Sequence, residues 1–599
     1  MAKSDTINVG GLVTFTVKVD GKVIPDEYLV YSIHVEKMVN RIPLARVSII
    51  DGSAAKEDFT VSSSKTFVPG GELQVEVGYD LKEKQIFKGI ITEQNIKIND
   101  SESSMLIVEA RDKSIALTVD RKCKTFSKKK DSDILSSIIK TYSGLSSSVT
   151  ATTIEWPEQV QYYTTDWDFV LTRAETNGMI VTPNDGKISV AKPDADTASK
   201  LTITYGDNLM ECNTRLNSVQ QLSKVTGKAW DFKTQKIISA SSNQDMAGAG
   251  NLTSSTLAKV AGGTDFVQQT TAPLTSPELT SWTKAQLIKS GYSKILGEVK
   301  FYGTDLVNPS NYITLKGLGD RFDGDHLVSG VIHDISDGNW VTEATLGLPN
   351  QWFVEEPDVM APPTSALLPG AAGLFNAVVK KIYEDPDNQY RILIDIPNFD
   401  EKGEGIWARL STFYATNGAG AFFLPEVNDE VIVGFLNEDP RFPIILGSLY
   451  SSSKNKPYKT LKPNEKNSHK AIASKSGLLV EFNDEDKILT IVTPSKNTVV
   501  FSDKDKSISL KDQNNNSIVM DASGIEIKSP KNITLNATQK VIVKGAQGVD
   551  VSASGGDVTV KGVNIKENAN VQFVAKGGAQ AEVSGGAQLT LKGAMVMIN

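Results

Sequence analysis

The sequence holds few of the residues that usually carry acid–base, nucleophilic or metal chemistry. Its 599 residues include two cysteines and four histidines. Two cysteines can form neither a disulfide framework nor a four-cysteine zinc site. The histidines show no HExxH motif and no His–x–His pair. The sequence therefore indicates no catalytic residues, no cofactor and no metal centre; the residues concerned are Cys123, Cys212, His34, His326, His333 and His469.

Three local patterns have a functional and a structural interpretation. His333 precedes Asp334, but it ends an apolar strand and no nucleophile lies in a recognisable motif, so a structural histidine is expected. The glycines of Gly317–Gly324 resemble a phosphate loop, yet the Lys-Ser/Thr pair is missing, which favours a β-turn. Cys123 lies in the basic run Arg121–Lys130, which we interpret as a solvated loop or a contact to an acidic partner.

Composition and charge limit the class of protein. The chain is 40% hydrophobic and 22% charged, as in foldable globular proteins, and its formal net charge is −8. That balance argues against a protein that coats nucleic acid or anionic lipid. The first residues lack a signal-peptide core, and the longest apolar run, Gly418–Leu424, is far shorter than the ~20 residues of a membrane span. We expect synthesis in the cytoplasm without a signal peptide.

A repeat near the carboxyl end is the strongest pattern. From about residue 471 aromatic residues become rare, and pairs of apolar residues two apart recur every eight residues: Ile525/Ile527, Ile533/Leu535, Val541/Val543 and Val549/Val551. The phase slips at Val558 and Val560 and returns at Phe573, Ala581, Leu589 and Met597. This spacing predicts short strands with one buried face, joined by tight corners rich in Gly and Asn.

Something must cover that apolar face. Each covered Val or Ile contributes roughly 1.5–3 kcal/mol, whereas ordering costs ~1–2 kcal/mol per residue. A single-chain β-helix usually repeats after roughly 18 residues or more. A period of eight suits three identical chains around one axis, each forming one face of a triangular prism; a single-chain solenoid and a stack of hairpins remain alternatives.

Two further regions precede the repeat. Residues 370–455 read as a five-stranded OB-fold, with strands expected at Gly373–Tyr383, Tyr390–Ile396, Trp407–Leu410, Val431–Phe435 and Ile444–Leu446. Its acidic loops would repel phosphate, so we expect no nucleic-acid binding, and we expect its aromatics in the core or at an interface: Phe413, Tyr414, Phe422 and Phe423.

Residues 1–355 read as mostly β. Strands are expected at Val13–Val19, Leu44–Ile50, Glu72–Tyr79, Met105–Ala110, Gly297–Tyr302, Tyr312–Leu315 and Val328–His333. Helices are expected at Asp131–Tyr142, Thr165–Asn177 and Thr283–Ser290, with Thr165 as an N-cap. Residues 241–282 are expected to form a long surface excursion.

The order of these parts resembles VgrG-type spike proteins, the fused hub and needle of contractile phage tails, type VI secretion systems and related injection systems. The resemblance is carried by Gln161–Gly178, Gly297–Gly303, Lys316–Gly319 with Phe322, His333 with Asn339 and Trp340, Gly373–Val379 and, most specifically, Pro425–Tyr450. The resemblance spans essentially the whole chain.

The resemblance implies a mainly β fold with minor α: a hub of two β-barrel-like subdomains, an OB-fold barrel and a C-terminal intertwined trimeric β-helix. The expected division is hub 1–355 with a helical insertion at about 131–200, Pro-rich linker 356–369, OB-fold 370–455, connector 456–470 and needle 471–599. The implied function is a non-enzymatic homotrimeric central spike. Its implied partners are a hexameric inner tube protein, baseplate proteins, a PAAR-repeat tip protein, cargo effectors and, transiently, the target membrane during ejection.

Some features of relatives are not expected here. The ~20 residues of Ser451–Lys470 are too few for an inserted lysozyme-like domain, and we expect no effector domain after the needle. Met595, Met597 and Ile598 are expected either to dock a tip protein or simply to close the prism. The alternatives from other classes are a β-helical polysaccharide-binding or polysaccharide-degrading tailspike and an OB-fold nucleic-acid binder.

Overall fold

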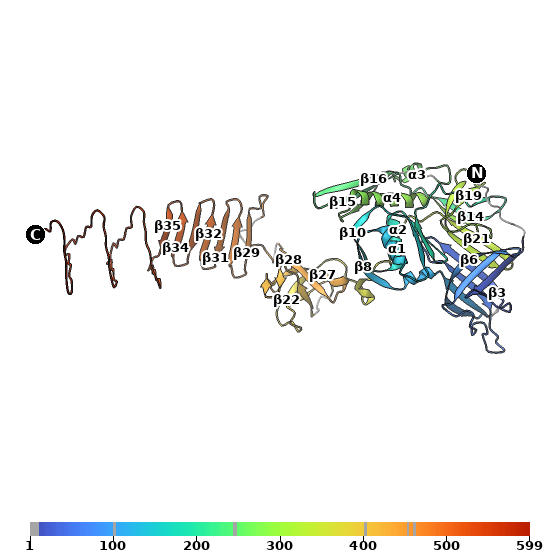
Figure 1. The fold of residues 1–599 in the computed structure, drawn as a ribbon, viewed down its shortest axis with the longest axis horizontal. Coiled ribbons are helices and arrows are strands. Elements are labelled where there is room, and N and C mark those ends of the chain that lie inside the picture. The colour runs from blue at the N-terminus through green and yellow to red at the C-terminus, as the bar shows by residue number, and fades with distance from the viewer. Residues whose placement is uncertain are drawn as a thin grey trace. The chain divides into compact units, whose positions relative to one another are not determined.

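The chain is mainly β and divides into two compact units, Met1–Ser448 and Leu449–Asn599, each described below by itself (Figure 1). The structure is a computed structural model. It describes residues 11–99, 104–243, 248–399, 404–451, 454–458 and 463–598.

A thirteen-stranded sheet forms the base of the first unit. Its first group of strands is β1 (Val13–Val19), β2 (Lys22–Val23), β3 (Val30–Met38), β4 (Leu44–Ile50), β5 (Glu72–Tyr79), β6 (Lys82–Lys97) and β7 (Met105–Arg111). Its second group is β13 (Leu201–Thr204), β14 (Leu209–Leu216), β18 (Ile295–Tyr302), β19 (Tyr312–Lys316), β20 (Gly324–Ser336) and β21 (Asn339–Leu346).

One antiparallel pairing joins the two groups of strands. β3 pairs with β20, so that Ile33 lies opposite Ile335 although about three hundred residues separate them. Each group has its own apolar core: Val47 and Phe87 belong to the first and Phe301 to the second. The two groups are therefore parts of one continuous sheet with two cores.

A helical insertion packs beside this sheet. It contains η1 (Lys113–Thr118), β8 (Arg121–Lys130), α1 (Asp131–Ile139), β9 (Ser146–Val149), β10 (Glu155–Thr165), α2 (Asp166–Thr176), β11 (Ile180–Asn184) and β12 (Lys187–Ala191). Ile138 of α1 and Val170 of α2 share one core. α1 is three residues shorter than the apolar spacing predicts, ending at Ile139.

The expectation of a solvated loop at Arg121–Lys130 is wrong. This run is strand β8, which pairs antiparallel with β10 along its length. Only Phe126 points into the core, and most of its lysines face solvent. The charges therefore mark the exposed face of a strand rather than a loop.

Residues 241–282, expected to form a long surface excursion, contain regular secondary structure in their described part. β16 (Lys236–Asn243) pairs with β15 (Lys224–Asp231), followed by α3 (Ser254–Ala261), β17 (Phe266–Thr270) and α4 (Ser276–Tyr292). α4 is longer than predicted because Glu278 accepts a 2.6 Å hydrogen bond from the backbone N–H of Thr275. Its buried face includes polar residues such as Thr283 and Gln286, which hid the helical periodicity.

A closed five-stranded barrel completes the first unit, as the sequence predicts. Its order is β22 (Phe375–Lys381), β23 (Ile392–Asp395), β24 (Ile406–Leu410), β28 (Pro443–Ser448) and β27 (Glu430–Phe435). The short hairpin β25 (Ala415–Thr416) and β26 (Ala419–Gly420) projects from it, η4 (Leu436–Glu438) joins β27 to β28, and η2 (Phe353–Glu355) and η3 (Pro363–Ala366) precede it.

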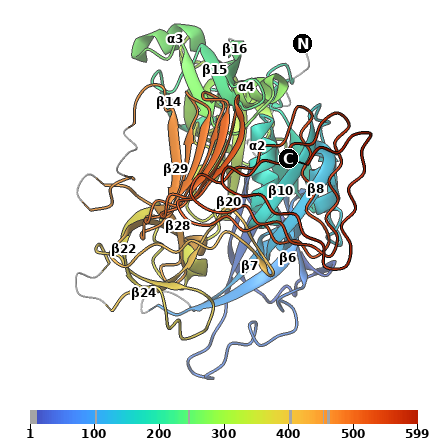
Figure 2. The same cartoon turned by 90° about the vertical axis from the view of Figure 1, so that its left-hand side faces the viewer.

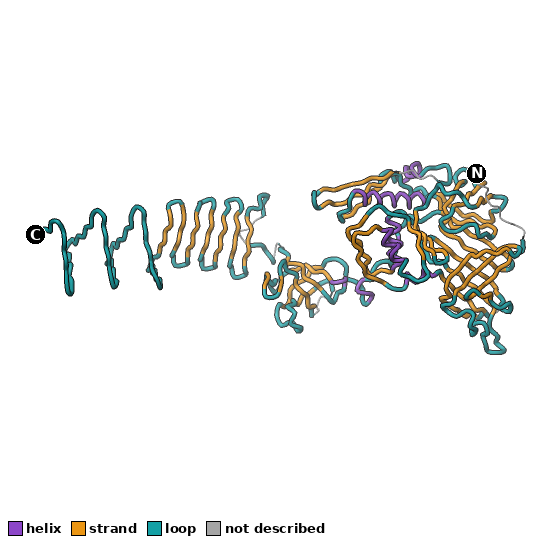
Figure 3. The backbone as a smooth tube through the Cα atoms, viewed as in Figure 1, coloured by secondary structure: helices purple, strands orange, loops and turns teal. Residues whose placement is uncertain are grey.

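The second unit begins with a seven-stranded antiparallel meander (Figures 1 and 2). Its strands are β29 (His469–Ala473), β30 (Leu479–Asn483), β31 (Ile488–Val492), β32 (Thr498–Ser502), β33 (Ser507–Lys511), β34 (Ser517–Asp521) and β35 (Gly524–Lys528). Residues 529–598 follow as an extended winding chain without helix or strand (Figure 3). The strands expected from the eight-residue repeat beyond Lys528 therefore do not pair within one chain.

The N-cap of α2 gives a direct test of the local structure. The Thr165 side chain accepts a 3.0 Å hydrogen bond from the backbone N–H of Asp168. We expect Thr165→Ala to weaken the first turn by about 1 kcal/mol, and its amides to exchange about fivefold faster in hydrogen-exchange mass spectrometry. Thr165→Ser, which keeps the hydroxyl, is the control, and equal exchange in both variants would contradict this role.

Candidate functional site

The apolar residues of the carboxyl-terminal repeat lie exposed on the single chain. We call them the apolar ladder: Ile525, Ile527, Ile533, Leu535, Val541, Val543, Val549, Val551, Phe573, Leu589, Leu591 and Met597. Ile533 is 53% exposed and Leu535 72% exposed, whereas Val47 in the first unit is fully buried. Exposed apolar rows of this length are typical of surfaces that contact a partner.

Two glycines eight residues apart explain how the repeat turns its corners. A Cβ on Gly577 would lie 2.0 Å from the carbonyl oxygen of Gln580, and one on Gly585 would lie 2.5 Å from that of Gln588. Only glycine permits the backbone to approach itself this closely. The corner thus repeats with the same period as the ladder.

The three residues expected at the tip are also exposed. Met595, Met597 and Ile598 have 78%, 82% and 87% of their surface in solvent. Asn599, which follows them, lies outside the described residues. The exposure leaves both interpretations of these side chains, docking and closure, as predictions.

His333 has a structural environment, as the sequence predicts. Its ring is buried, and its Nδ1 lies 3.0 Å from Thr342 Oγ1 and 3.3 Å from the indole nitrogen of Trp340, which donates to it. Burial lowers the pKa of His333 to about 3, with Lys37 adding to the effect. The ring therefore stays neutral, while Asp334 interacts with His34 at 2.6 Å instead.

The glycine-rich segment is a turn, as predicted. It joins β19 to β20, and the Asp323 carboxylate accepts hydrogen bonds from the backbone N–H groups of Gly317 and Leu318. These two backbone N–H groups therefore already donate to a carboxylate of the turn itself. Cys123 is an exposed residue of β8 whose sulfur lies 3.3 Å from the backbone nitrogen of Tyr163.

The four aromatic side chains of the barrel that were expected in the core or at an interface are not core residues. Phe413 is 90% exposed, and Tyr414, Phe422 and Phe423 are exposed beside it around the β25–β26 hairpin. The expectation that these residues lie in the core is wrong. The alternative, that they lie at an interface, stays a prediction. Nearby acidic loops are fixed by ion pairs: Arg391 holds the Asp385 carboxylate at 2.6 Å and keeps its pKa well below the usual range.

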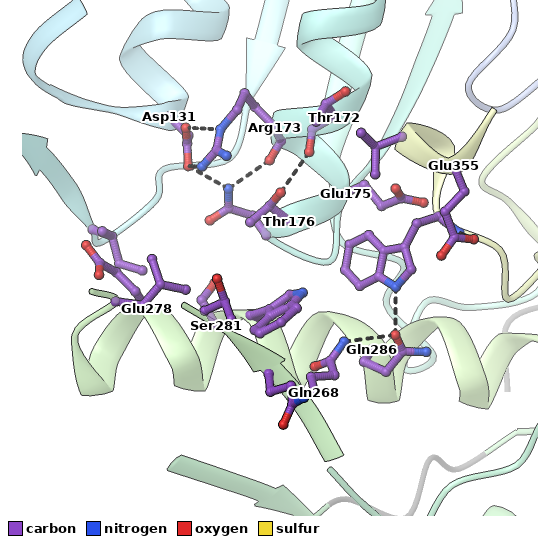
Figure 4. Close-up of a pocket in the computed structure, with 18 of the residues that line it drawn as sticks. Asp131, Thr172, Arg173, Glu175, Thr176, Gln268, Glu278, Ser281, Gln286 and Glu355 are labelled. Atoms are coloured by element: carbon purple, nitrogen blue, oxygen red, sulfur yellow. Dashed lines mark hydrogen bonds and ion pairs between the residues drawn. The ribbon is translucent and has the colours of Figure 1, made fainter. Parts of the chain in front are cut away.

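A pocket that the sequence analysis missed lies between α2, α4, β17 and the segment around Trp352 (Figure 4). Its volume is about 810 Å³. At one wall the Asp131 carboxylate accepts hydrogen bonds from Arg173, Asn177 and Trp156 at 2.8–3.0 Å. Burial opposes ionisation of Asp131, but these donors and the Arg173 charge outweigh it and lower its pKa.

On the opposite wall, hydrogen bonds between side chains link β17, α4 and Trp352. The Gln286 side-chain oxygen accepts from Gln268 at 3.1 Å and from the indole nitrogen of Trp352 at 2.7 Å, as Figure 4 shows. No local motif could have revealed the pocket, because its residues come from positions between 131 and 355.

Comparison with known proteins shows the family. The family model described as the Alg8 N-terminal domain matches residues 9–337, which is more than half of the chain. The chain belongs to this family. A second model, the type VI secretion system and phage-baseplate injector OB domain, matches residues 375–450 and coincides with the closed barrel of this Alg8-family chain.

Curated relatives of the Alg8-family chain are spike proteins. It is 29% identical over 134 residues to the type VI secretion system spike protein VgrG1a of Pseudomonas aeruginosa, covering 22% of this chain and 20% of that protein. It is 34% identical over 76 residues to VgrG3 of Vibrio cholerae, covering 12% and 8%. The chain thus spans a fifth or less of these relatives. The resemblance to VgrG-type spike proteins predicted from the sequence is confirmed.

Among solved structures, the 43 kDa tail protein of prophage MuSo2 from Shewanella oneidensis superposes with a TM-score of 0.44. It has 14% sequence identity and covers 56% of this chain and 99% of its own.

Two further observations describe the Alg8-family chain. In the described ranges, no three His, Cys, Asp or Glu side chains gather closely enough to hold a metal ion. Among the helices of the described residues, none has the length and apolar character of a membrane span.

The Asp131–Arg173 pair of the Alg8 domain gives the second prediction. Both side chains are nearly buried, at 2% and 12% exposure. We expect Asp131→Asn to cost about 3–5 kcal/mol, because it leaves the Arg173 charge buried without its counter-ion. Thermal unfolding of the full chain measures this loss.

The effect should depend on pH in a defined direction. A lowered carboxyl pKa stabilises the fold above the unfolded value of about 3.9, and that contribution is lost as pH falls through the folded pKa. The gap between wild type and Asp131→Asn should therefore be full above pH ~4 and shrink below it. Asp265→Asn, in an exposed ion pair with Lys224, is the control; an equal shift in both variants would contradict the assignment.

Proposed function

We propose that this protein is the homotrimeric central spike of a contractile injection apparatus. The exposed apolar ladder carries the proposal. Most of its side chains alternate with polar ones, as in Leu535 after Thr534, so these stretches present one apolar and one polar face; at Val541–Val543 the middle residue is the apolar Ile542. Two further copies of the same chain, related by a threefold axis, would cover the apolar face and supply the missing hydrogen-bond partners for the backbone.

The hub would link the hexameric inner tube to this threefold needle. Three chains that each carry two groups of strands can present six similar surfaces, and the two-core sheet of the first unit supports that arrangement. Baseplate proteins would surround the hub. The proposed division is hub 1–355, linker 356–369, OB-fold 370–455, connector 456–470 and needle 471–599.

The proposed action is mechanical, with no enzymatic step. Contraction would drive the spike out of the particle and through a target membrane, carrying a tip protein or effectors. A polysaccharide-degrading tailspike would need clustered carboxylates along the repeat, whereas its acids are few and irregularly spaced: Glu526, Asp550, Asp557, Glu567 and Glu582. Nucleic-acid binding by the OB barrel is disfavoured by the acidic loops around it.

The trimer has a direct test. Native mass spectrometry of the full chain should give three times the 64.8 kDa mass of one chain. Leu535→Lys, which would bring three charges together at the axis, should make residues after Lys528 sensitive to limited proteolysis, while Thr534→Lys on the polar face should not. A monomeric mass, or equal protease resistance of both variants, would remove the proposal.

We further propose that Met595, Met597 and Ile598 dock a PAAR-repeat tip protein. Three apolar side chains, each contributing roughly 1.5–3 kcal/mol when covered, would account for much more than tenfold in affinity. Changing all three to serine should weaken binding of a purified PAAR-repeat protein from the same organism by at least about tenfold. Lys592→Ser is the control, and unchanged binding by the triple variant would indicate that these residues only close the prism.

A further inference from the structure

The pocket of the hub borders a strand edge that no described strand occupies. The small sheet has the order β16-β15-β17, so β17 pairs with β15 on one side only. All five residues of β17, Phe266–Thr270, line the pocket. A free strand edge offers a row of backbone N–H and C=O groups that an extended peptide can pair with.

The walls of the pocket are acidic. Four carboxylates line it: Asp131, Glu175, Glu278 and Glu355. Among the lining residues, Arg173 is the positively charged one. That guanidinium already forms two hydrogen bonds to Asp131. Glu175 is likewise paired, with Lys289, so the excess negative charge comes from Glu278 and Glu355, and it favours a ligand that brings a positive group.

Aromatic rings add to this preference. The Trp156 ring is already contacted by Arg173, at 5.0 Å from the ring centroid, and the Trp352 ring by Lys289, at 5.3 Å. Trp282 on α4 is half-buried and lines the same pocket, and no described residue places a cation over its ring. An incoming Lys or Arg can take that place.

Gln268, the central residue of β17, supports a binding role. Its side chain is more than nine-tenths buried, and its oxygen has no hydrogen-bond partner among the described residues although its nitrogen donates to Gln286. An acceptor left unpaired in this way has a cost that a donor from a ligand would remove.

We propose that this pocket binds an extended peptide segment with a central Lys or Arg, which adds as a strand to β17. Backbone pairing along β17 would supply the affinity, and the carboxylates with Trp282 would select the basic side chain. Strand addition is favoured over binding of a sugar, because the open edge presents five consecutive backbone units. The site lies within one chain, so it does not depend on the trimer.

The test uses the full-length protein and a fluorescein-labelled heptapeptide of alternating threonine and valine with lysine at its centre. Fluorescence anisotropy should detect saturable binding, and the same peptide with a central glutamate should bind at least about tenfold more weakly, a difference of about 1.4 kcal/mol. N-methylation of the amides on one edge of the peptide should abolish binding, while N-methylation on the other edge should not. Equal binding of the lysine and glutamate peptides would overturn the proposal.

Two variants locate the site. Trp282→Ala should weaken the lysine peptide, and Trp282→Phe should restore part of the affinity, which a folding defect alone would not do. Glu355→Gln should reduce the preference for lysine over glutamate, since it removes the negative charge of an exposed side chain while keeping its size. Trp230→Ala, on the exposed part of β15, is the matched control.

Two further outcomes would contradict the binding of a peptide by strand addition. Saturable binding of a chito-oligosaccharide without binding of the peptide would make the pocket a sugar site. Loss of peptide binding in Trp230→Ala as much as in Trp282→Ala would assign the effect to stability. Either result overturns strand addition but leaves the mass measurement of the trimer unaffected.

Discussion

The spacing of the carboxyl-terminal repeat decides how the second unit can be stabilised. A strand that pairs with the next strand of its own chain needs residues for the strand and residues for the turn. Strands β29 to β34 start nine or ten residues apart, which leaves room for a five-residue strand and a turn. When the period falls to eight after Lys528, pairing within the chain stops and the apolar side chains stay exposed. In the proposed trimer, two other chains would supply the missing contacts.

If the proposed trimer forms, folding and assembly of the repeat are inseparable. A single copy of residues 529–598 would leave both its apolar face and its backbone groups without partners, which ordering entropy does not permit in water. Conversely, a prism of three chains has no stable partly unwound state, because releasing one chain uncovers the faces of the other two. Resistance to rupture is then set by the rate of unfolding rather than by the equilibrium free energy of one chain.

Sequence alone predicted those elements whose residues repeat locally. β1, β4 and β5 match their expected ranges because alternate residues of each are buried. β17 was missed and α4 was predicted only over Thr283–Ser290, because their buried faces carry Gln268, Thr283 and Gln286, which no hydrophobic pattern reveals. The pocket was missed for a different reason: Asp131 and Trp352 are brought together by tertiary packing, and no spacing in the sequence encodes it.

The pairing of β3 with β20 could not be predicted from the sequence. A local pattern can indicate a strand, but it does not say which distant strand will pair with it. The consequence of this pairing is mechanical. Backbone hydrogen bonds between residues 32–38 and 330–336 couple the two groups of strands, and Ile335 and Trp340 of the second group complete the core of the first. A load applied to one group is therefore transmitted through a continuous ladder of hydrogen bonds, not through a hinge. Such a sheet suits a body that must keep its shape while force passes along it, which is what the proposed spike function would require of the first unit.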